Sequence, residues 1–479
     1  MNKKNNIFVG NNLHYKLNFK DWISLDKKKS LLRFLTCGSV DDGKSTLIGR
    51  LLYDTKHIYE DHLLSLHGDS KRHGTQGNKL DYALLVDGLQ AEKEQGITID
   101  VAYRYFSTNK RKFIIADTPG HEQYTRNMVT GASNCDLAIL LIDVRKGLLE
   151  QTCRHAFIAV LLGINYLVIA INKMDLVDYK KDFFDKIKKD FICFSNKLNK
   201  ELKIFFVPIV ATIGENIVSS KNLMEWYQGS TLLHILETVK VNNILKKSNV
   251  RFPIQYVNRP NLDFRGYSGT LVSGNLRVFD KVKVLPSGMV STIEKIVTFN
   301  GNQDQVEERQ AITVVLKDNL DISRGDMLVD LNSNLIGLQR AIIYIVWMSE
   351  TDLFLNKLYN VKLGNQNTRV YIKNILYEIN VNTLKKNKKN NLCLNSVAVV
   401  EIKFEKPILF DLYCENKITG SMIFIDPISN ITIAAGMIQK KLDQKDKKQD
   451  VNMNNFELEL RLLISRYFPH WGVKKVFNN

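Results

Sequence analysis

Eight consecutive residues near the start of the chain have the types and spacing of a loop that binds phosphate groups. Residues 38–45 are Gly-Ser-Val-Asp-Asp-Gly-Lys-Ser and match the pattern GxxxxGK(S/T). The two glycines let backbone N–H groups approach phosphate oxygens, because no Cβ stands in the way. We expect Lys44 to reach the β- and γ-phosphates and Ser45 to ligate Mg²⁺. The alternative interpretation is a glycine-rich turn before a helix.

A second motif, Asp117-Thr118-Pro119-Gly120, follows the apolar run at 113–116. An acid at the carboxyl end of a strand can hold Mg²⁺ through water, and Gly120 can offer its N–H to a γ-phosphate. The pattern DxxG is weak by itself. Because it stands behind a phosphate loop and a buried strand, it predicts a further part of one nucleotide site.

A third motif, Asn172-Lys173-Met174-Asp175, follows the apolar run at 166–171. Asp175 can accept the N1–H and the exocyclic amine of guanine together, whereas adenine lacks that pair of donors. We expect Asn172 to bridge to the phosphate loop and the Lys173 stem to lie along the base. NKxD alone is weak, but in third place along the chain it favours GTP over ATP.

Strands and helices that could position these motifs alternate from residue 31 to about residue 240. Strand-like apolar runs occupy 31–37, 99–106, 113–116, 137–142, 166–171 and 205–209. Apolar residues at helical spacing mark 44–53, 149–162 and 180–194. Buried strands that alternate with helices predict a mostly parallel sheet with both faces covered. Each of the three motifs then directly follows a strand.

The pattern changes after about residue 250. Short runs rich in Val, Ile and Thr predict compact β-barrels or sandwiches, and they lie at 269–272, 281–284, 311–316 and 397–404. Apolar residues on one helical face at 456–468 predict a helix that docks on a protein surface. The predicted segments are an N-terminal extension at 1–30, a nucleotide domain at 31–243, barrels at 248–340 and 341–438, a linker at 439–455, and a C-terminal helix and tail at 456–479.

The composition is that of a globular protein, with 44% hydrophobic and 24% charged residues, and it excludes a mainly disordered or collagen-like chain. The net charge of +17 would suit nucleic-acid binding. However, Lys/Asn runs at 1–30, 180–203, 381–391 and 440–450 carry +5, +4, +4 and +2. We interpret most of this charge as solvated, with a polyanion surface as the alternative.

The cysteines and the apolar runs bear on the compartment. None of the six cysteines forms a CxxC pair, so we expect them to be reduced and structural. No apolar run approaches the roughly 18 residues that span a bilayer, and the first ten residues lack the apolar core of a signal peptide. We therefore expect a cytoplasmic protein.

In their order along the chain, the three motifs resemble those of the translation-factor GTPases. The run at 96–99, Gly-Ile-Thr-Ile, resembles the first switch of that superfamily, whose Thr98 would close on Mg²⁺ and the γ-phosphate. His121 resembles the residue that positions the attacking water, with Val40 and Ile97 as its apolar flanks. A histidine can hold a water in line with the γ-phosphorus. The alternative role is that of an ordinary loop histidine.

The fifth nucleotide motif departs from the superfamily pattern. Where the family has Ser-Ala-Lys or Ser-Ala-Leu, this chain has Val210-Ala211-Thr212. The family contact to the guanine O6 is a backbone N–H, so Ala211 can still supply it. The missing Ser hydroxyl leaves the rigidity of the loop and the nucleotide affinity as open questions.

Longer runs resemble one family within this superfamily, the large GTPase subunits of bacterial heterodimeric sulfate adenylyltransferases. The stretch 99–178, with the Asp-Thr-Pro-Gly-His-Glu-Gln-Tyr-Thr-Arg-Asn-Met run at 117–128, carries the resemblance, and so do 255–267, 321–326 and 468–472. It covers nearly the whole chain apart from the Lys/Asn tracts and the N-terminal extension. It implies a P-loop GTPase domain of α/β type followed by two small β-barrels, as in elongation factor Tu.

The resemblance also implies a function. GTP hydrolysis on this subunit would be coupled to the formation of adenosine 5′-phosphosulfate and diphosphate from ATP and sulfate, on a smaller partner subunit that binds both substrates. The chain contains no second GxxxxGK(S/T) and no adenylyltransfer motif of HxGH or SGGxDS type. We therefore expect the adenylyl chemistry to lie in the partner of a heterodimer.

The expected site residues fall into three groups. The catalytic group comprises His121, Lys44, Thr98 and Gly120. The metal group comprises Ser45, Thr98 and Asp117. The residues expected to bind GTP are Gly38, Ser39, Val40, Asp41, Asp42, Gly43, Lys44, Ser45, Asp117, Thr118, Pro119, Gly120, His121, Asn172, Lys173, Met174, Asp175 and Ala211.

Other features leave alternatives open. A translation factor that delivers aminoacyl-tRNA would share this architecture, but the runs at 255–267 and 468–472 argue against it. A solitary signalling GTPase does not explain two barrels. The insert at 54–95 carries four of the nine histidines. We interpret it as a switch extension that touches the partner, with a metal site as the alternative. Arg259 and Arg265 are either structural or contacts to the partner or the nucleotide domain.

Overall fold

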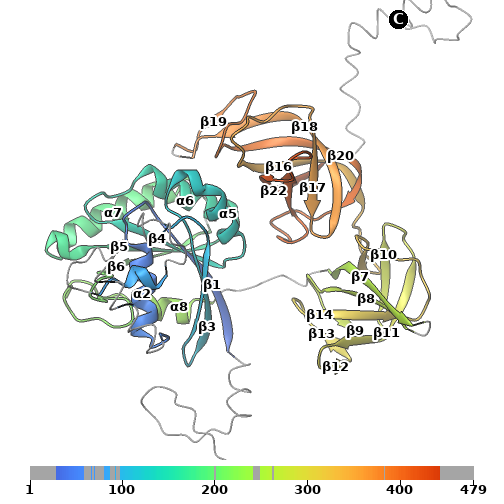
Figure 1. Ribbon diagram of the computed structural model, residues 1–479, viewed down its shortest axis with the longest axis horizontal. Helices are drawn as coiled ribbons and strands as arrows, with labels where there is room; N and C mark the ends of the chain where they lie inside the picture. The colour runs from blue at the N-terminus through green and yellow to red at the C-terminus, as the bar shows by residue number, and fades with distance from the viewer. Residues whose placement is uncertain are drawn as a thin grey trace, which may run out of the picture.

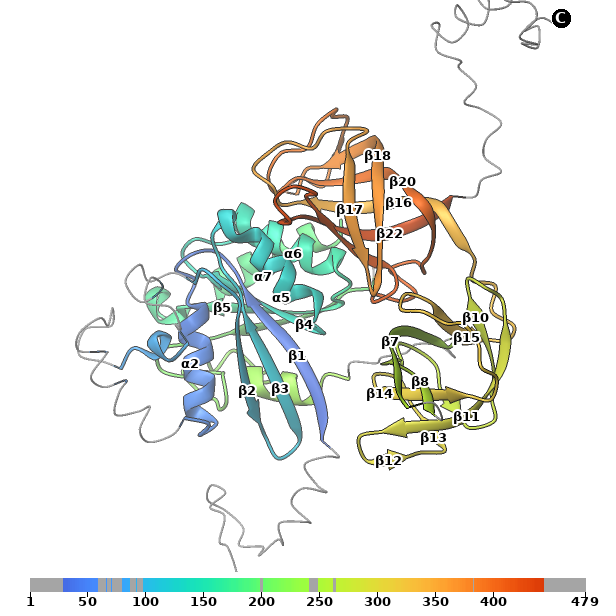
Figure 2. The same ribbon diagram turned by 45° about the vertical axis from the view of Figure 1, so that its right-hand side comes forward.

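The structure, a computed structural model, describes residues 29–58, 66, 70, 80–86, 92, 98–198, 201–240, 249–261, 264–381 and 383–442. It contains one α/β body and two β-barrels, which lie beside it and against each other (Figures 1 and 2). The predicted N-terminal extension, the helix at 456–468, three of the four insert histidines and Ile97 lie outside the described residues. Within the described part, no helix has the length and apolar character needed to cross a membrane.

The α/β body is built on a six-stranded sheet with the order β2-β3-β1-β4-β5-β6. Only β2 runs antiparallel, as the hairpin partner of β3, and the other strands are parallel. The sheet therefore matches the predicted fold class. Its strands are β1 (Ser30–Cys37), β2 (Ala102–Ser107), β3 (Arg111–Asp117), β4 (Leu137–Asp143), β5 (Tyr166–Asn172) and β6 (Lys203–Pro208).

Helices cover both faces of this sheet. One apolar cluster joins the sheet to the first group of helices, α5 (Thr125–Ser133), α6 (Glu150–Leu161) and α7 (Lys181–Ser195). A second cluster joins the opposite face to α2 (Lys44–Asp54) and α8 (Leu232–Thr238). Every residue of the central strand β4 is buried, as a parallel strand between two helix layers requires. Short 3-10 turns complete the body at η1 (Tyr82–Leu85), η2 (Glu122–Tyr124) and η3 (Met174–Val177).

One predicted strand starts later than its apolar run. Residues 99–106 were expected to form a strand, but β2 begins at Ala102. The carboxylate of Glu92 accepts the backbone N–H groups of Ile99, at 2.9 Å, and of Asp100, at 3.2 Å. A side chain from the preceding insert thus takes the donors that a longer strand would use, which sequence periodicity cannot show.

The first barrel is a closed antiparallel sheet. Its order is β10-β15-β7-β8-β14-β11, and pairing of β10 with β11 closes the ring, while β12 extends it and β9 pairs with β13 outside it. The strands are β7 (Arg251–Asn261), β8 (Phe264–Thr270), β9 (Leu276–Arg277), β10 (Lys281–Leu285), β11 (Val290–Thr298), β12 (Gly301–Asn302), β13 (Gln305–Val306), β14 (Ala311–Leu316) and β15 (Met327–Asp330).

The second barrel has the same plan. Its order is β17-β21-β22-β16-β20-β18, and pairing of β17 with β18 closes the ring. Closure leaves no long free strand edge in either barrel. The strands are β16 (Gly337–Trp347), β17 (Leu358–Leu363), β18 (Gln366–Ile379), β19 (Lys386–Asn387), β20 (Val397–Leu409), β21 (Ser421–Ile425) and β22 (Thr432–Leu442).

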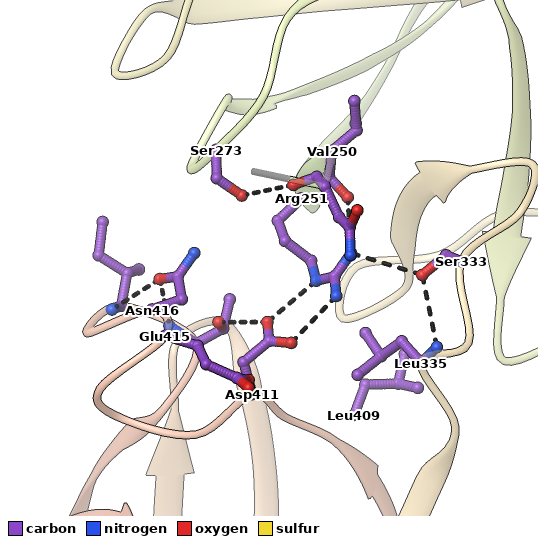
Figure 3. Close-up of polar contacts among 12 residues, drawn as sticks. Val250, Arg251, Ser273, Ser333, Leu335, Leu409, Asp411, Glu415 and Asn416 are labelled. Atoms are coloured by element: carbon purple, nitrogen blue, oxygen red, sulfur yellow. Dashed lines mark hydrogen bonds and ion pairs between the residues drawn. The ribbon is translucent and has the colours of Figure 1, made fainter. Parts of the chain in front are cut away.

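Both barrels are joined to their neighbours by polar contacts from one loop, residues 410–420, between β20 and β21. Asp411 of this loop forms a bidentate pair with Arg251 of the first barrel, at 2.9 and 3.0 Å, and the pair lies between the two barrels (Figure 3). From the same loop, Tyr413 and Lys417 donate to carbonyl groups at the end of α6. The second barrel thus contacts both other parts of the molecule.

Candidate functional site

The phosphate loop runs from the end of β1 to the start of α2. Gly38 has φ +149°, and an added Cβ would lie 2.7 Å from the carbonyl oxygen of Leu141, so only glycine fits there. Gly43 caps α2 in a left-handed conformation. The loop therefore lies against the N-terminus of α2, where free backbone N–H groups and the helix dipole favour an anion.

Lys44 lies at the centre of this loop. Its side chain is buried, and its ammonium donates to the carbonyls of Ser39, at 2.9 Å, and Gly38, at 3.4 Å. Burial lowers the pKa of Lys44, although the charge of Asp117 opposes the shift. A buried ammonium held by two carbonyl dipoles lacks a bonded counter-charge, and a phosphate oxygen at this point would supply one.

Gly120 brings the second motif to the same point. It follows β3, and an added Cβ would lie 2.5 Å from Lys44 Nζ and 2.9 Å from the carbonyl oxygen of Gly38. Thr118 holds the turn, because its hydroxyl donates to the Thr36 carbonyl at 2.7 Å. The tertiary structure thus places Gly120 beside the ammonium that is expected to meet the γ-phosphate.

Three oxygen groups converge next to Lys44. The hydroxyl of Ser45 lies 3.4 Å from that of Thr98 and donates to Asp117 at 3.4 Å. The other oxygen of Asp117 accepts from Thr36 at 3.0 Å. Burial raises the pKa of Asp117 to about 6, against the opposing charge of Lys44. A carboxylate and two hydroxyls are the oxygen ligands that Mg²⁺ prefers, so the residues present fit this ion.

Asn172 joins the third motif to the phosphate loop. Its amide donates to the Asp42 carbonyl at 2.8 Å and accepts from the Ala211 N–H at 3.0 Å. Lys173 donates to the Asp41 carbonyl, and Asp175 is exposed. The expected bridge between the two motifs is therefore present, and the carboxylate expected to select guanine is accessible.

Three residues expected at the base and phosphates have other surroundings. The N–H of Ala211 already donates to Asn172, so its contact with a guanine O6 stays a prediction. The side chain of Met174 is fully buried in the apolar cluster beneath the site. Asp42 is also buried; one of its carboxylate oxygens accepts from the Ser39 N–H at 2.7 Å. Burial raises the pKa of Asp42 to about 6.

His121 lies in the turn directly after Gly120, and its side chain is exposed. Its Nδ1 accepts the backbone N–H of Gln123 at 3.2 Å. A neutral imidazole has one donor and one acceptor nitrogen, so the proton of His121 belongs on Nε2. Val40, its expected apolar flank, is half-buried in the phosphate loop. The described insert histidine, His57, instead accepts from the Ser107 N–H at 3.2 Å and packs on Phe106.

Among the described residues, no three His, Cys, Asp or Glu side chains are grouped so as to hold a metal ion. This does not argue against the Mg²⁺ ligands above, since two of those are hydroxyl groups. Arg265 donates to Asn319 at 2.6 Å and lies 3.6 Å from Asp321. Both contacts lie within the first barrel, and a contact of Arg265 with a partner stays a prediction.

The structure adds His155 of α6 to the site, which motif analysis missed. Its ring is fully buried, and Nδ1 accepts the N–H of Gly38, the first residue of the phosphate loop, at 3.2 Å. Burial lowers the pKa of His155 to about 3, with the charge of Lys44 adding to the shift. The available sequence signal was a histidine on the apolar face of a predicted helix, shared with Ile158 and Leu162.

Two family descriptions match the chain. Residues 29–249 match the elongation factor Tu GTP binding domain, and residues 340–439 match the GTP-eEF1A C-terminal domain-like family. Among solved structures, the bacterial selenocysteine-specific elongation factor EF-Sec is 21% identical, with a TM-score of 0.40 over 85% of this chain and 58% of that one. A likeness this weak supports no inference.

Similar sequences extend over nearly the full length of the chain. "Sulfate adenylyltransferase subunit 1" of Buchnera aphidicola subsp. Acyrthosiphon pisum (strain 5A) is 60% identical over 97% of this chain and 98% of its own. The protein of the same name from Erwinia tasmaniensis is 58% identical over 95% of both chains. These similarities confirm the resemblance found in the motifs and the longer runs. The chain belongs to the sulfate adenylyltransferase subunit 1 family, within the superfamily of elongation-factor-Tu-like GTPases.

Proposed function

We propose that this chain is the GTP-hydrolysing subunit of a sulfate adenylyltransferase, a nucleotidyltransferase of sulfate assimilation. The observation that carries the proposal is the convergence of Lys44, Gly120 and the Ser45–Thr98–Asp117 oxygens at one point, in a chain 60% identical to proteins of that name. The partner is a smaller subunit that binds ATP and sulfate, and the complex works in the cytoplasm.

The loop binds the phosphates of GTP through its backbone and through Lys44. The ammonium already lies within the loop, at 2.9 Å from the Ser39 carbonyl, where a phosphate oxygen would meet it. Ser45, Thr98 and Asp117 would hold Mg²⁺, which would neutralise charge on the phosphates when bound. An ionised Asp117 is needed for this, and the positive charges of the ion and Lys44 favour that form.

His121 orients the attacking water. With Nδ1 occupied by the Gln123 N–H, the free Nε2–H donates a hydrogen bond to the water. The ring therefore positions the water and does not take its proton. Catalysis of phosphoryl transfer depends mainly on such positioning and on charge stabilisation, which Lys44 and the Gly120 N–H provide at the γ-phosphate.

GTP hydrolysis drives adenosine 5′-phosphosulfate formation through the partner. The anhydride is very unfavourable to form, and this chain has no adenylyltransfer motif of its own. Coupling requires that the partner bind differently to the GTP and GDP states of this subunit, since a ligand shifts an equilibrium only by its differential affinity.

The test is an assay of the reconstituted complex. The chain is co-expressed with the proposed smaller subunit that binds ATP and sulfate, and sulfate-dependent diphosphate release is measured with and without GTP. We expect stimulation by GTP, and we expect Lys44→Ala to abolish it. A matched control, Lys146→Ala, removes an exposed lysine that donates to the Val40 carbonyl of the loop from outside, at 3.4 Å, and should retain stimulation.

Two results would overturn the proposal. Diphosphate release that does not respond to GTP would exclude coupling. Tight, GTP-dependent binding of aminoacyl-tRNA would instead support a translation factor, the competing function for this architecture.

A further inference from the structure

Helix α6 contacts the phosphate loop from its middle and the second barrel at its C-terminal end. His155 makes the first contact, through the N–H of Gly38 at 3.2 Å. At the C-terminal end, Tyr413 donates to the Leu162 carbonyl at 3.0 Å and Lys417 donates to the Gly163 carbonyl at 2.9 Å. One helix therefore connects the loop that holds the nucleotide to a different domain.

The contact at His155 is specific in its chemistry. The other ring nitrogen, Nε2, lies 2.9 Å from the amide nitrogen of Gln151, and the oxygen of that amide accepts from Arg154 at 3.1 Å. Both ring nitrogens of His155 thus have polar neighbours, in a ring with no exposed surface. Gly38 N–H is buried too, and a buried donor that loses its acceptor is strongly destabilised. The position of the loop is thus tied to that of His155.

The contact at the barrel is equally close. Gly163 has φ +76°, and an added Cβ would lie 2.7 Å from Lys417 Cε, so glycine allows the lysine to approach the end of the helix. Apolar packing continues across the junction, because Ile158 and Ala159 of α6 belong to one cluster with Val346 and Met437 of the second barrel.

The same loop of the second barrel, residues 410–420, also contacts the first barrel. Asp411 lies two residues from Tyr413 and binds Arg251 through both carboxylate oxygens, at 2.9 and 3.0 Å. Thr419 also donates to Asp411, at 2.7 Å, and Figure 3 shows the Arg251–Asp411 pair lying between the two barrels. A displacement of the loop at 410–420 would therefore move both barrels together.

We propose that His155 is a positioning residue for the phosphate loop, and that α6 carries the position of that loop to both barrels through Tyr413 and Lys417. This inference rests on the proposed function, since it names the route by which the nucleotide state reaches the surfaces that meet the partner subunit. The helix is suited to the task. It has 12 residues, about 18 Å of regular structure. Its contact with the loop is made by the buried His155 side chain, and its contacts with the barrel are made by the carbonyl groups of Leu162 and Gly163, directly after its last turn.

The first arm of the test concerns His155. His155→Leu removes the acceptor for Gly38 N–H and should raise the dissociation constants of GTP and GDP roughly 10-fold. His155→Asn keeps an acceptor near the Nδ1 position and should restore both constants to within about 3-fold of the original. Ile158→Val, a change in the same buried face of α6 that leaves the loop untouched, is the control for packing alone. Equal weakening by all three variants would overturn the role of His155.

The second arm concerns the junction with the barrel, in the complex with the partner subunit. The double variant Tyr413→Phe, Lys417→Met should leave GTP and GDP affinity within about 2-fold. It should reduce the GTP stimulation of diphosphate release by about 5-fold or more, as expected for a coupling of order 1–3 kcal/mol. The control is Lys357→Met, which removes an ion pair with Asp426 elsewhere on the same barrel. Full stimulation in the double variant would overturn the route through α6.

A cycle that combines His155→Leu, at saturating GTP, with the double variant decides whether the two ends act together. If the combined variant loses less GTP stimulation than the product of the two separate fold-reductions, the two ends belong to one connected route. If its loss equals that product, the two ends act independently and the route is overturned. A different result would show that the proposed function itself is wrong. In that case the unaltered complex shows no stimulation by GTP, while the nucleotide affinities of the His155 variants still test the positioning role.

Discussion

At the scale of single residues, the site places two buried groups of opposite charge, Lys44 and Asp117, close to each other. Burial disfavours the charged forms of both, since it lowers the pKa of Lys44 and raises that of Asp117 to about 6. Their mutual attraction offsets part of this penalty. A magnesium–nucleotide complex would complement both at once, because its phosphates meet the ammonium and its cation meets the carboxylate.

The role proposed for His121 predicts that a substitution can slow GTP hydrolysis without weakening GTP binding. Because the ring is exposed in the turn after Gly120 and holds no buried group in place, His121→Ala should leave GTP affinity within about 3-fold. Loss of the water-orienting Nε2–H should slow single-turnover GTP hydrolysis by ~10²-fold or more. Rapid-quench measurement of phosphate release, with GTP affinity determined in parallel, checks both expectations. Unchanged hydrolysis would remove His121 from the mechanism.

His155 predicts a pH dependence of folding. Its pKa is about 3 in the folded protein and about 6.5 in an unfolded chain. The lowered value means that its contribution to stability is fully present above about pH 6.5 and is lost as the pH falls through about 3. Between about pH 7.5 and 5.5, the unfolding free energy of His155→Asn should therefore decline by about 1 kcal/mol less than that of the unaltered protein.

This pH comparison is made on the nucleotide-free protein by urea unfolding, followed by far-ultraviolet circular dichroism, which reports helices. Every helix that the structure describes lies in the GTPase domain. The two carboxyls with raised pKa, Asp42 and Asp117, titrate in both proteins and cancel in the difference. Parallel pH profiles for the two proteins would contradict the expectation.

At the scale of elements, the loop after β6 shows how the fifth motif is held without its serine. Val210 is 1% exposed and belongs to the apolar cluster. Its carbonyl accepts the N–H groups of Gly214, at 2.9 Å, and Glu215, at 3.3 Å. The Glu215 carboxylate in turn accepts from Ser220 and Lys221. The loop is organised by its backbone, by Glu215 and by Asn172, so a hydroxyl at position 210 is not needed.

Restoring the family serine should therefore bring no benefit. Val210→Ser removes buried methyl groups and places a hydroxyl among apolar side chains, which costs about 1–3 kcal/mol of stability. GTP affinity should not improve. Thermal unfolding and nucleotide titration measure the two quantities, with Val210→Ala as the variant that removes volume without adding a polar group. Tighter GTP binding by Val210→Ser would show that the hydroxyl matters.

At the scale of the whole molecule, the orientation of the barrels depends on a buried ion pair. The side chains of Arg251 and Asp411 are only 8% and 6% exposed. Burial alone would raise the pKa of Asp411, but the hydrogen bonds and the charge of Arg251 outweigh it, and the pKa is lowered. Each of the two buried charges is thus stabilised by the other, and removing one partner would leave the other charge buried without a counter-charge.

Asp411→Asn should accordingly destabilise the pair of barrels by about 3–5 kcal/mol, because it leaves the buried Arg251 guanidinium without a counter-charge. Differential scanning calorimetry of the full chain should show a lower transition for the barrels. The control is Glu405→Gln, which breaks the exposed pair with Arg369 and should cost at most about 1 kcal/mol. If the two changes lower the stability of the barrels equally, the buried pair does not hold the barrels together.

The motifs were predictable because the chemistry of each is local. Residues 38–45, 117–120 and 172–175 each stand after an apolar run, and both strands and helices of the α/β body follow periodicities of a few residues. The order of the motifs predicted their convergence and indicated the superfamily, and the longer runs at 99–178, 255–267, 321–326 and 468–472 indicated the family. Periodicity did not reveal where β2 begins, since Glu92 takes the backbone donors of Ile99 and Asp100.

The sequence by itself determined the nucleotide motifs, the alternation of strands and helices, and the change to β structure after about residue 250. Only the tertiary structure brought together His155 and Gly38, which are 117 residues apart, and Arg251 and Asp411, which are 160 apart. Such pairs leave no periodic pattern in the chain. They form because folding buries polar groups that must find partners wherever the packing of the domains places them.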